Sequence, residues 1–121
     1  MFARRLASGL TVLGLALTAC TGGGSAPGSG QSIMVQGSDY KFEAANVTVK
    51  ANQPAQITFR NTSGQLHDWT VQGLDQSVVA LAQPGQSANI QFTPTKTGTF
   101  KVICAQPGHE ELGMVGQLTV Q

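Results

Sequence analysis

The chain has 121 residues, of which 7 are basic and 6 acidic, and this length suits one domain rather than two. Arg4 and Arg5 lie in a segment that we expect to be removed, which leaves 7 − 2 = 5 basic residues against 6 acidic ones. So small a net charge provides no basic surface for a phosphate backbone, and we expect no nucleic-acid partner.

Residues 1–19 resemble a bacterial lipoprotein signal peptide. The two arginines precede an apolar stretch of twelve residues, 6–17, which is shorter than the roughly 20 residues that a membrane-spanning helix needs. The stretch ends in the sequence LTAC at residues 17–20, which resembles a lipobox. The resemblance implies cleavage before Cys20, lipidation of Cys20 and export to the cell envelope, on its periplasmic or extracytoplasmic face. The alternatives are an uncleaved apolar anchor and cleavage without lipid.

The chain contains two cysteines, Cys20 and Cys104. If Cys20 carries lipid, Cys104 has no partner for a disulfide, although export implies an oxidising compartment. A lone cysteine in such a compartment is either buried and inert or held by a metal.

The residues after the signal divide into a tether and a domain. Residues 20–32 comprise the lipidated cysteine and a stretch rich in glycine and serine, which predicts a flexible tether. The remainder, Ile33 to Gln121, contains short alternating segments separated by turn sequences, and this pattern predicts an all-β sandwich of seven or eight strands. The segment 74–83 is ambiguous and could contain a short strand at Val78-Val79.

The alternation also places three side chains with metal-binding atoms on the core side. In the alternating pattern, Cys104 falls on the same face of its strand as the apolar residues 100 and 102. In the same way, His67 falls on the face of residues 69 and 71, and Met114 on the face of residues 118 and 120. A fourth candidate, His109, lies in the loop of residues 105–113. In that loop Pro107 and Gly108 supply a bend that could bring the candidates together.

The donor types then select the ion. Cys104, His109 and Met114 follow one another at intervals of five residues, a spacing that neither a helix nor a strand would bring to one face. With His67 they offer a thiolate, two imidazoles and a thioether, which suit copper that cycles between Cu(I) and Cu(II). Structural zinc sites use cysteine and histidine ligands rather than a thioether, and an iron–sulfur cluster needs more cysteines. Each residue alone has an ordinary explanation as a core or loop residue, but together they predict one copper ion.

The run from 104 to 116, CAQPGHEELGMVG, resembles the ligand loop of cupredoxins, the blue copper proteins that include azurins, auracyanins and plastocyanins. His67, followed by a polar residue and an aromatic one, resembles the upstream histidine of that family. The resemblance implies a Greek-key β-sandwich with one type 1 copper. It also implies the ligands: His67, Cys104 and His109 equatorial, Met114 axial, and the carbonyl of Leu66 as a weak further contact.

The sequence departs from the family pattern in three respects. Asp68 stands where asparagine is common, Ala105 stands where a hydroxyl residue is common, and the azurin disulfide is absent. The Asp68 carboxylate could instead accept a hydrogen bond from a backbone N–H. The backbone N–H groups of Asp68 and Gln106 are the expected donors to the sulfur of Cys104.

The resemblance implies a monomeric one-electron carrier rather than an enzyme. Its partners would be redox proteins such as c-type cytochromes or a terminal reductase or oxidase, and Cys20 would attach it to a membrane. The edge of His109 is the expected entry for electrons. Leu66, Pro107 and Leu112 are expected to form a small docking patch around it, of the size that suits weak redox encounters.

Three other classes remain as alternatives. Copper delivery or storage would use the same ligands, although such proteins tend to expose clusters of methionine and histidine, and only Met34 and Met114 remain after cleavage. A Cys104 nucleophile with a histidine base would need a cleft and an oxyanion hole, for which a domain of this size has little room. An immunoglobulin-like module without metal would leave all four candidate ligands unused.

Overall fold

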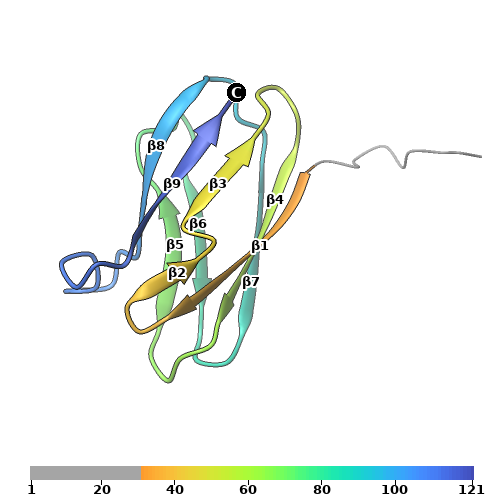
Figure 1. Cartoon of the computed structure of the whole chain (residues 1–121). Helices are drawn as coiled ribbons and strands as arrows, with labels where there is room; N and C mark the ends of the chain where they lie inside the picture. The colour runs from red at the N-terminus through yellow and green to blue at the C-terminus, as the bar shows by residue number, and fades with distance from the viewer. Residues whose placement is uncertain (1–30) are drawn as a thin grey trace, which may run out of the picture.

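Nine strands make up the part of the chain that the structure, a computed structural model, describes, residues 31–121 (Figure 1). Their bounds are β1 Gln31–Ser38, β2 Lys41–Glu43, β3 Asn46–Val49, β4 Ala55–Asn61, β5 His67–Val71, β6 Val78–Ala82, β7 Ser87–Phe92, β8 Gly98–Ile103 and β9 Val115–Val120. The signal expected at 1–19, the lipidation site Cys20 and most of the tether expected at 20–32 lie outside the described residues. β1 begins at Gln31, two residues before the expected start of the domain at Ile33. The structure contains no helix within residues 31–121 that could span a membrane.

The strands form two mixed sheets. One has the order β2-β1-β4-β7 and the other the order β3-β9-β8-β5-β6. β1 runs parallel to β4 and β3 runs parallel to β9, whereas the other neighbouring strands are antiparallel. The loop between β8 and β9 projects sideways from the lower half of the sandwich as drawn in Figure 1, and the C-terminus lies at the upper end. The predicted all-β, Greek-key sandwich is confirmed.

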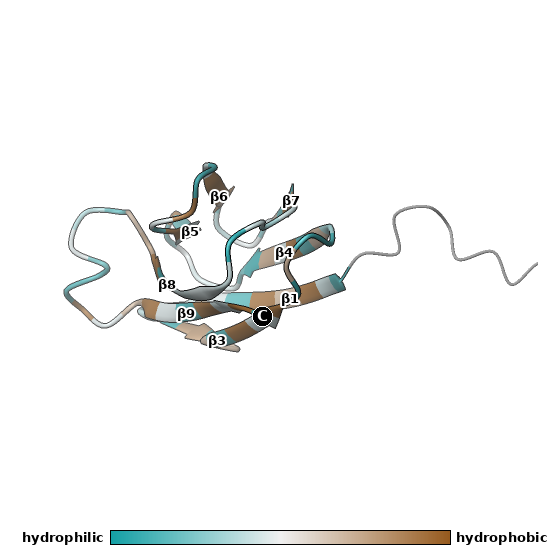
Figure 2. Ribbon diagram, turned by 90° about the horizontal axis from the view of Figure 1, so that it is seen from above, coloured by the Kyte–Doolittle hydropathy of each residue, from teal (hydrophilic) through white to brown (hydrophobic). Residues whose placement is uncertain are grey.

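The core lies between the sheets and is built from alternate residues of their strands. Ile57 and Phe59 of β4 and Leu118 and Val120 of β9 are at most 2% exposed, and Trp69 of β5 is 1% exposed. Figure 2 shows hydrophobic and hydrophilic residues alternating along β1 and β9. Because full burial of such a side chain stabilises the fold by about 1.5–3 kcal/mol, this alternation accounts for the sandwich.

The structure contains more strands than the seven or eight that we expected. β6 covers Val78–Ala82, so the short strand expected at Val78-Val79 is present and longer. β2 has only three residues, and β1 turns Gly37 inward at a position where alternation would require an apolar side chain. The alternation of apolar and polar residues is therefore weak in β1 and β2, and the sequence pattern does not reveal these two strands.

Gly116 marks a close approach between β9 and the backbone before β3. A Cβ atom at Gly116 would lie 2.3 Å from the carbonyl oxygen of Ala45. That oxygen accepts a hydrogen bond from the N–H of Gln117 at 2.7 Å, so it cannot withdraw without disturbing the β3–β9 pair. A Cβ atom at Gly64, in contrast, would meet nothing within 4 Å.

We expect Gly116→Ala to lower the free energy of unfolding by about 1–3 kcal/mol, because the added methyl group overpacks a rigid contact. The matched variant Gly64→Ala should change it by less than about 0.5 kcal/mol. Denaturant unfolding followed by the fluorescence of Trp69 measures both. Equal stabilities of the two variants would contradict the close approach of β9 to Ala45.

Candidate metal centre

Three of the four predicted ligands lie where strands of the larger sheet begin or end. His67 is the first residue of β5, Cys104 directly follows β8, and Met114 directly precedes β9. β8 lies between β5 and β9 and is antiparallel to both. The start of β5, the end of β8 and the start of β9 therefore meet at the same edge of the sheet.

The loop from 104 to 114 returns His109 to this edge. Gly108 has a φ of 79°, a left-handed conformation that glycine adopts without strain, so the bend expected at Pro107 and Gly108 is present. The N–H of Met114 donates to the carbonyl of His109, and the N–H of Cys104 donates to the carbonyl of Met114, both at 3.1 Å. Because these hydrogen bonds connect the backbones of Cys104, His109 and Met114, they fix the positions from which the three side chains extend.

Two ring nitrogens and one sulfur form a small buried triangle. Nδ1 of His67 lies 3.1 Å from Nδ1 of His109, and Sγ of Cys104 lies 3.7 Å from the first nitrogen and 3.5 Å from the second. His67 and Cys104 have no exposed surface, whereas His109 is 8% exposed. The histidine that we expected to meet solvent is thus mostly covered, although it is the most exposed member of the triangle.

Met114 is fully buried and packs against β1. A Cβ atom on Gly37 would lie 3.2 Å from Cε of Met114 and 2.5 Å from the ring of Phe59. Glycine at this position therefore leaves room for the methionine side chain and the aromatic ring. His67, Cys104, His109 and Met114 are together arranged as in a type 1 copper site.

The surroundings of the sulfur disfavour a free thiolate. Burial raises the pKa of the Cys104 thiol above its ordinary value, while the backbone N–H groups of Asp68 and Gln106 act in the opposite direction. The N–H of Asp68 lies 3.4 Å from the sulfur. A buried cysteine of this kind is a poor nucleophile on its own, and a bound cation would stabilise its thiolate form.

The Asp68 carboxylate connects the segments that carry His67 and Cys104. It is 2% exposed and accepts hydrogen bonds from the N–H of Ala105 at 2.9 Å, the side-chain amide of Gln106 at 2.9 Å and the hydroxyl of Thr70 at 2.6 Å. The carboxylate thus accepts a backbone N–H, as its chemistry suggested. The connection between the two ligand segments forms here without asparagine and without a hydroxyl residue at 105.

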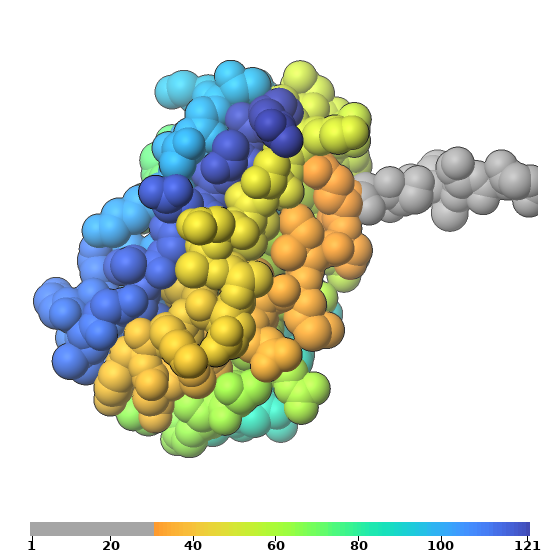
Figure 3. Space-filling model, in the orientation of Figure 1, coloured from red at the N-terminus to blue at the C-terminus, as the bar shows by residue number. Residues whose placement is uncertain are grey.

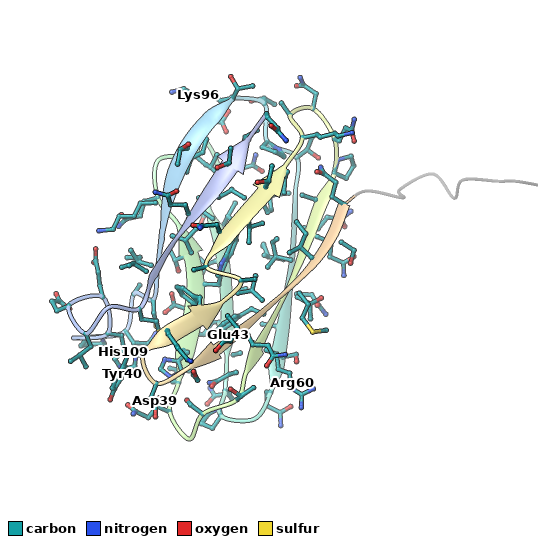
Figure 4. The ribbon with its side chains drawn as sticks, in the orientation of Figure 1. Asp39, Tyr40, Glu43, Arg60, Lys96 and His109 are labelled. Atoms are coloured by element: carbon teal, nitrogen blue, oxygen red, sulfur yellow. The ribbon has the colours of Figure 1, made fainter. Side chains whose placement is uncertain are left out.

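Asp39 and Tyr40, which lie between β1 and β2, also contact the site, although the sequence did not predict them. Oδ1 of Asp39 lies 2.8 Å from Nε2 of His67, and this hydrogen bond lowers the pKa of Asp39 below its ordinary value. The ring of Tyr40 meets both histidines edge-on, with centroid distances of 5.0 Å to His109 and 6.3 Å to His67. Figure 4 shows Asp39, Tyr40 and His109 at one end of the sandwich. The sequence GSDY indicates a turn, but it carries no signal that this turn faces the ligands.

The residues expected to dock a partner lie on the two segments that carry the histidines. Leu112 is 60% exposed and Pro107 is exposed, whereas Leu66 is partly buried. On the same loop, Glu110 forms an ion pair with Lys101 of β8. An exposed pair of this kind contributes at most about 1 kcal/mol, and it joins the loop to the strand before it.

The triangle fits a copper ion. Metal–nitrogen and metal–sulfur bonds of about 2.0–2.3 Å place three donors around one ion roughly 3.5–4 Å apart. The distances of 3.1, 3.7 and 3.5 Å within the triangle are close to these values. Two imidazoles and a thiolate with a nearby thioether are the donors of blue copper sites.

Comparison with known proteins agrees with this chemistry. A family model described as a cupredoxin-like domain matches residues 9–120. Auracyanin-A of Chloroflexus aurantiacus is 31% identical over an alignment of 150 positions, which covers 92% of each chain. Its solved structure, described as that of a "blue" copper protein, has a TM-score of 0.65 with this chain at 26% identity, and covers 74% of this chain and 98% of its own.

Two further proteins are similar. The copper-resistant cuproprotein CopI of Rubrivivax gelatinosus is 29% identical, and the alignment covers 81% of this chain and 71% of that protein. The structure of a dithionite-reduced auracyanin from Roseiflexus castenholzii has a TM-score of 0.69 at 22% identity, and covers 78% of this chain and 99% of its own. The similarity to the Roseiflexus castenholzii structure shows that the agreement in fold extends well beyond the ligand loop.

Proposed function

Because the chain belongs to the cupredoxin-like family, whose homologues bind copper, we propose that it is a one-electron carrier between redox partners in the cell envelope. The observation that carries this proposal is the buried triangle of His67 Nδ1, Cys104 Sγ and His109 Nδ1. Auracyanin-A, which is similar over most of both chains, is described as a blue copper protein.

We assign His67, Cys104 and His109 as equatorial ligands and Met114 as the axial ligand, with the Leu66 carbonyl as a weak further contact. Copper bound there would supply a centre that alternates between Cu(I) and Cu(II). The chain's own task is to keep the donors in place while the charge changes. The loop hydrogen bonds and the Asp68 carboxylate do this by fixing the backbone on either side of the ligands.

The same features favour a carrier over an enzyme. His67, Cys104 and Met114 have no exposed surface, so a substrate could not reach the metal without displacing a ligand. His109, at 8% exposed, is the ligand through which an electron would pass to a partner at the surface. We assign no catalytic residue.

Contact with a partner is assigned to Leu66, Pro107 and Leu112, with a c-type cytochrome or a terminal reductase or oxidase as the partner. Leu112, at 60% exposed, is the most accessible of the large apolar side chains on the described surface. A small apolar patch suits a weak, short-lived encounter. We further propose that a lipid on Cys20 holds the protein, as a monomer, at a membrane on the periplasmic or extracytoplasmic side.

The direct test of the copper assignment is to add Cu(II) to the purified protein and record its visible spectrum. We expect an intense sulfur-to-copper charge-transfer band at a ratio of one ion per chain, because a thiolate ligand faces the ion. Cys104→Ser should remove the band, while Ser32→Ala, an exposed hydroxyl on β1, should leave it unchanged. A protein that binds Cu(II) with the same spectrum in the Cys104→Ser variant would rule out the proposed site.

Copper handling is the second candidate, because CopI, a copper-resistant cuproprotein, is similar over 81% of this chain. A carrier should retain copper in both oxidation states against a competing chelator, whereas a delivery protein should release it in one of them. We expect retention through repeated reduction and reoxidation, since the donors are buried and connected through the backbone. Release of Cu(I) on every reduction would favour copper handling.

The docking assignment predicts that Leu112→Lys slows electron exchange with a soluble c-type cytochrome by roughly fivefold or more, the equivalent of about 1 kcal/mol of lost contact. Met34→Lys is the matched control, because Met34 is similarly exposed, at 59%, but lies on β1. Stopped-flow kinetics at constant ionic strength measures both variants, whose copper spectra should be unchanged. Equal rates for the two variants would show that partners dock elsewhere.

A further inference from the structure

The end of β1 and the turn between β1 and β2 contact three of the four ligands from the opposite sheet. Gly37 leaves room for Met114, Asp39 faces His67, and Tyr40 packs against His109. Figure 3 shows the β1–β2 segment beside the β8–β9 loop on the surface of the molecule, and Figure 4 shows Asp39 and Tyr40 next to His109. Among these contacts, the one from Asp39 has a defined chemical consequence.

The contact between Asp39 and His67 determines which ring nitrogen carries the proton. Oδ1 of Asp39 lies 2.8 Å from Nε2 of His67, and a carboxylate can only accept, so Nε2 carries the hydrogen. In a neutral ring the lone pair is then on Nδ1, the nitrogen that faces the sulfur of Cys104 at 3.7 Å. Asp39 therefore selects the tautomer that a ligand at Nδ1 needs.

The turn that carries Asp39 is connected to the segment before β5 through its neighbour Tyr40. The side chain of Asp39 is 41% exposed, and the nearby polar side chains of Ser63 and Gln65 add to His67 in lowering the pKa of its carboxyl. The side-chain amide of Gln65 also donates to the hydroxyl of Tyr40 at 3.0 Å. The carboxylate therefore places a negative charge 2.8 Å from the nitrogen of a ring that has no exposed surface.

A negative charge on the far side of a ligating imidazole makes that ring a stronger donor. A stronger donor stabilises the more highly charged state of a bound ion relative to the less charged one. The same hydrogen bond fixes the rotation of the ring about the Cβ–Cγ bond and keeps the proton on Nε2. The two effects act on different measurable quantities, the reduction potential and the tautomer.

We propose that Asp39 is a positioning residue of the copper site, whose carboxylate holds His67 in the orientation and tautomer that present Nδ1 to the ion, and favours Cu(II) over Cu(I). This inference rests on the proposed function, because it takes His67 as a ligand. Asp39 touches no bound ion; it acts through His67.

The test compares Asp39→Asn, Asp39→Ala and the control Asp75→Asn. Asparagine retains an oxygen that can accept the hydrogen bond but removes the charge, whereas alanine removes both. Asp75 is an exposed aspartate in the loop after β5, at the end of that strand opposite His67. The control therefore makes the same change of charge away from the metal centre.

Voltammetry of the copper-loaded protein supplies the first readout. We expect Asp39→Asn to raise the midpoint potential, Asp39→Ala to raise it further, and Asp75→Asn to leave it unchanged. Loss of an outer partner of a ligating histidine typically weakens metal binding 10–100-fold. If the loss falls on Cu(II) alone, each tenfold change raises the potential by about 59 mV.

The second readout is the tautomer of His67 in the metal-free protein, from the nitrogen shifts of its ring in NMR. We expect the Nε2–H form in the natural protein and in Asp75→Asn, and a mixture of tautomers in Asp39→Ala. Should Asp39→Ala fail to fold, the potential of Asp39→Asn decides. An unchanged potential in Asp39→Asn, or an unchanged tautomer in a folded Asp39→Ala, would overturn the proposal.

Failure of the proposed function would appear differently. If the natural protein forms no copper site with Cys104 as a ligand, there is no charge-transfer band in any variant, while the tautomer of His67 can still be measured. If the band is present and both Asp39 variants behave like Asp75→Asn, the copper site stands and Asp39 has no positioning role.

Discussion

Two imidazole nitrogens and one sulfur face one another at 3.1 to 3.7 Å in the interior of this protein. Polar atoms removed from water are unfavourable unless something pairs with them, and without a metal only protons shared between these three atoms can pair them. A cation between them can replace those protons, because it attracts all three lone pairs. The fold must therefore provide enough stability elsewhere to keep these donors together.

The two sheets share that task. The larger sheet places His67, Cys104 and Met114 at one edge, because β5, β8 and β9 are neighbours with alternating directions. The smaller sheet contributes the β1–β2 turn, which covers the site from the other side. We expect a set of donors that is held from two sides to change little in geometry when the charge of a bound ion changes. This property is the one that a one-electron carrier requires, and it needs no cleft for a substrate.

The clustering of His67, Cys104, His109 and Met114 could be predicted from the sequence, because three of them follow one another along one loop and His67 follows the alternation of a strand. The chemistry of Asp68 was also accessible, since a carboxylate next to a ligand must find donors and the adjacent loop supplies Ala105 and Gln106. Gly37, Asp39 and Tyr40 could not be found in this way. Their role depends on how one sheet is placed over the other, and no periodicity within a strand encodes that placement. The number of strands was underestimated for a related reason, because Gly37 interrupts the apolar pattern of β1.

The central claim is that the chain holds one set of donors around copper in both oxidation states. X-ray absorption at the copper edge, recorded on the oxidised and on the reduced protein, measures the ligands of the ion in each state. We expect one short sulfur contact and two nitrogen contacts in both states, with only small changes in distance on reduction. Loss of a nitrogen or of the sulfur in either state, or its replacement by oxygen from water, would contradict the claim.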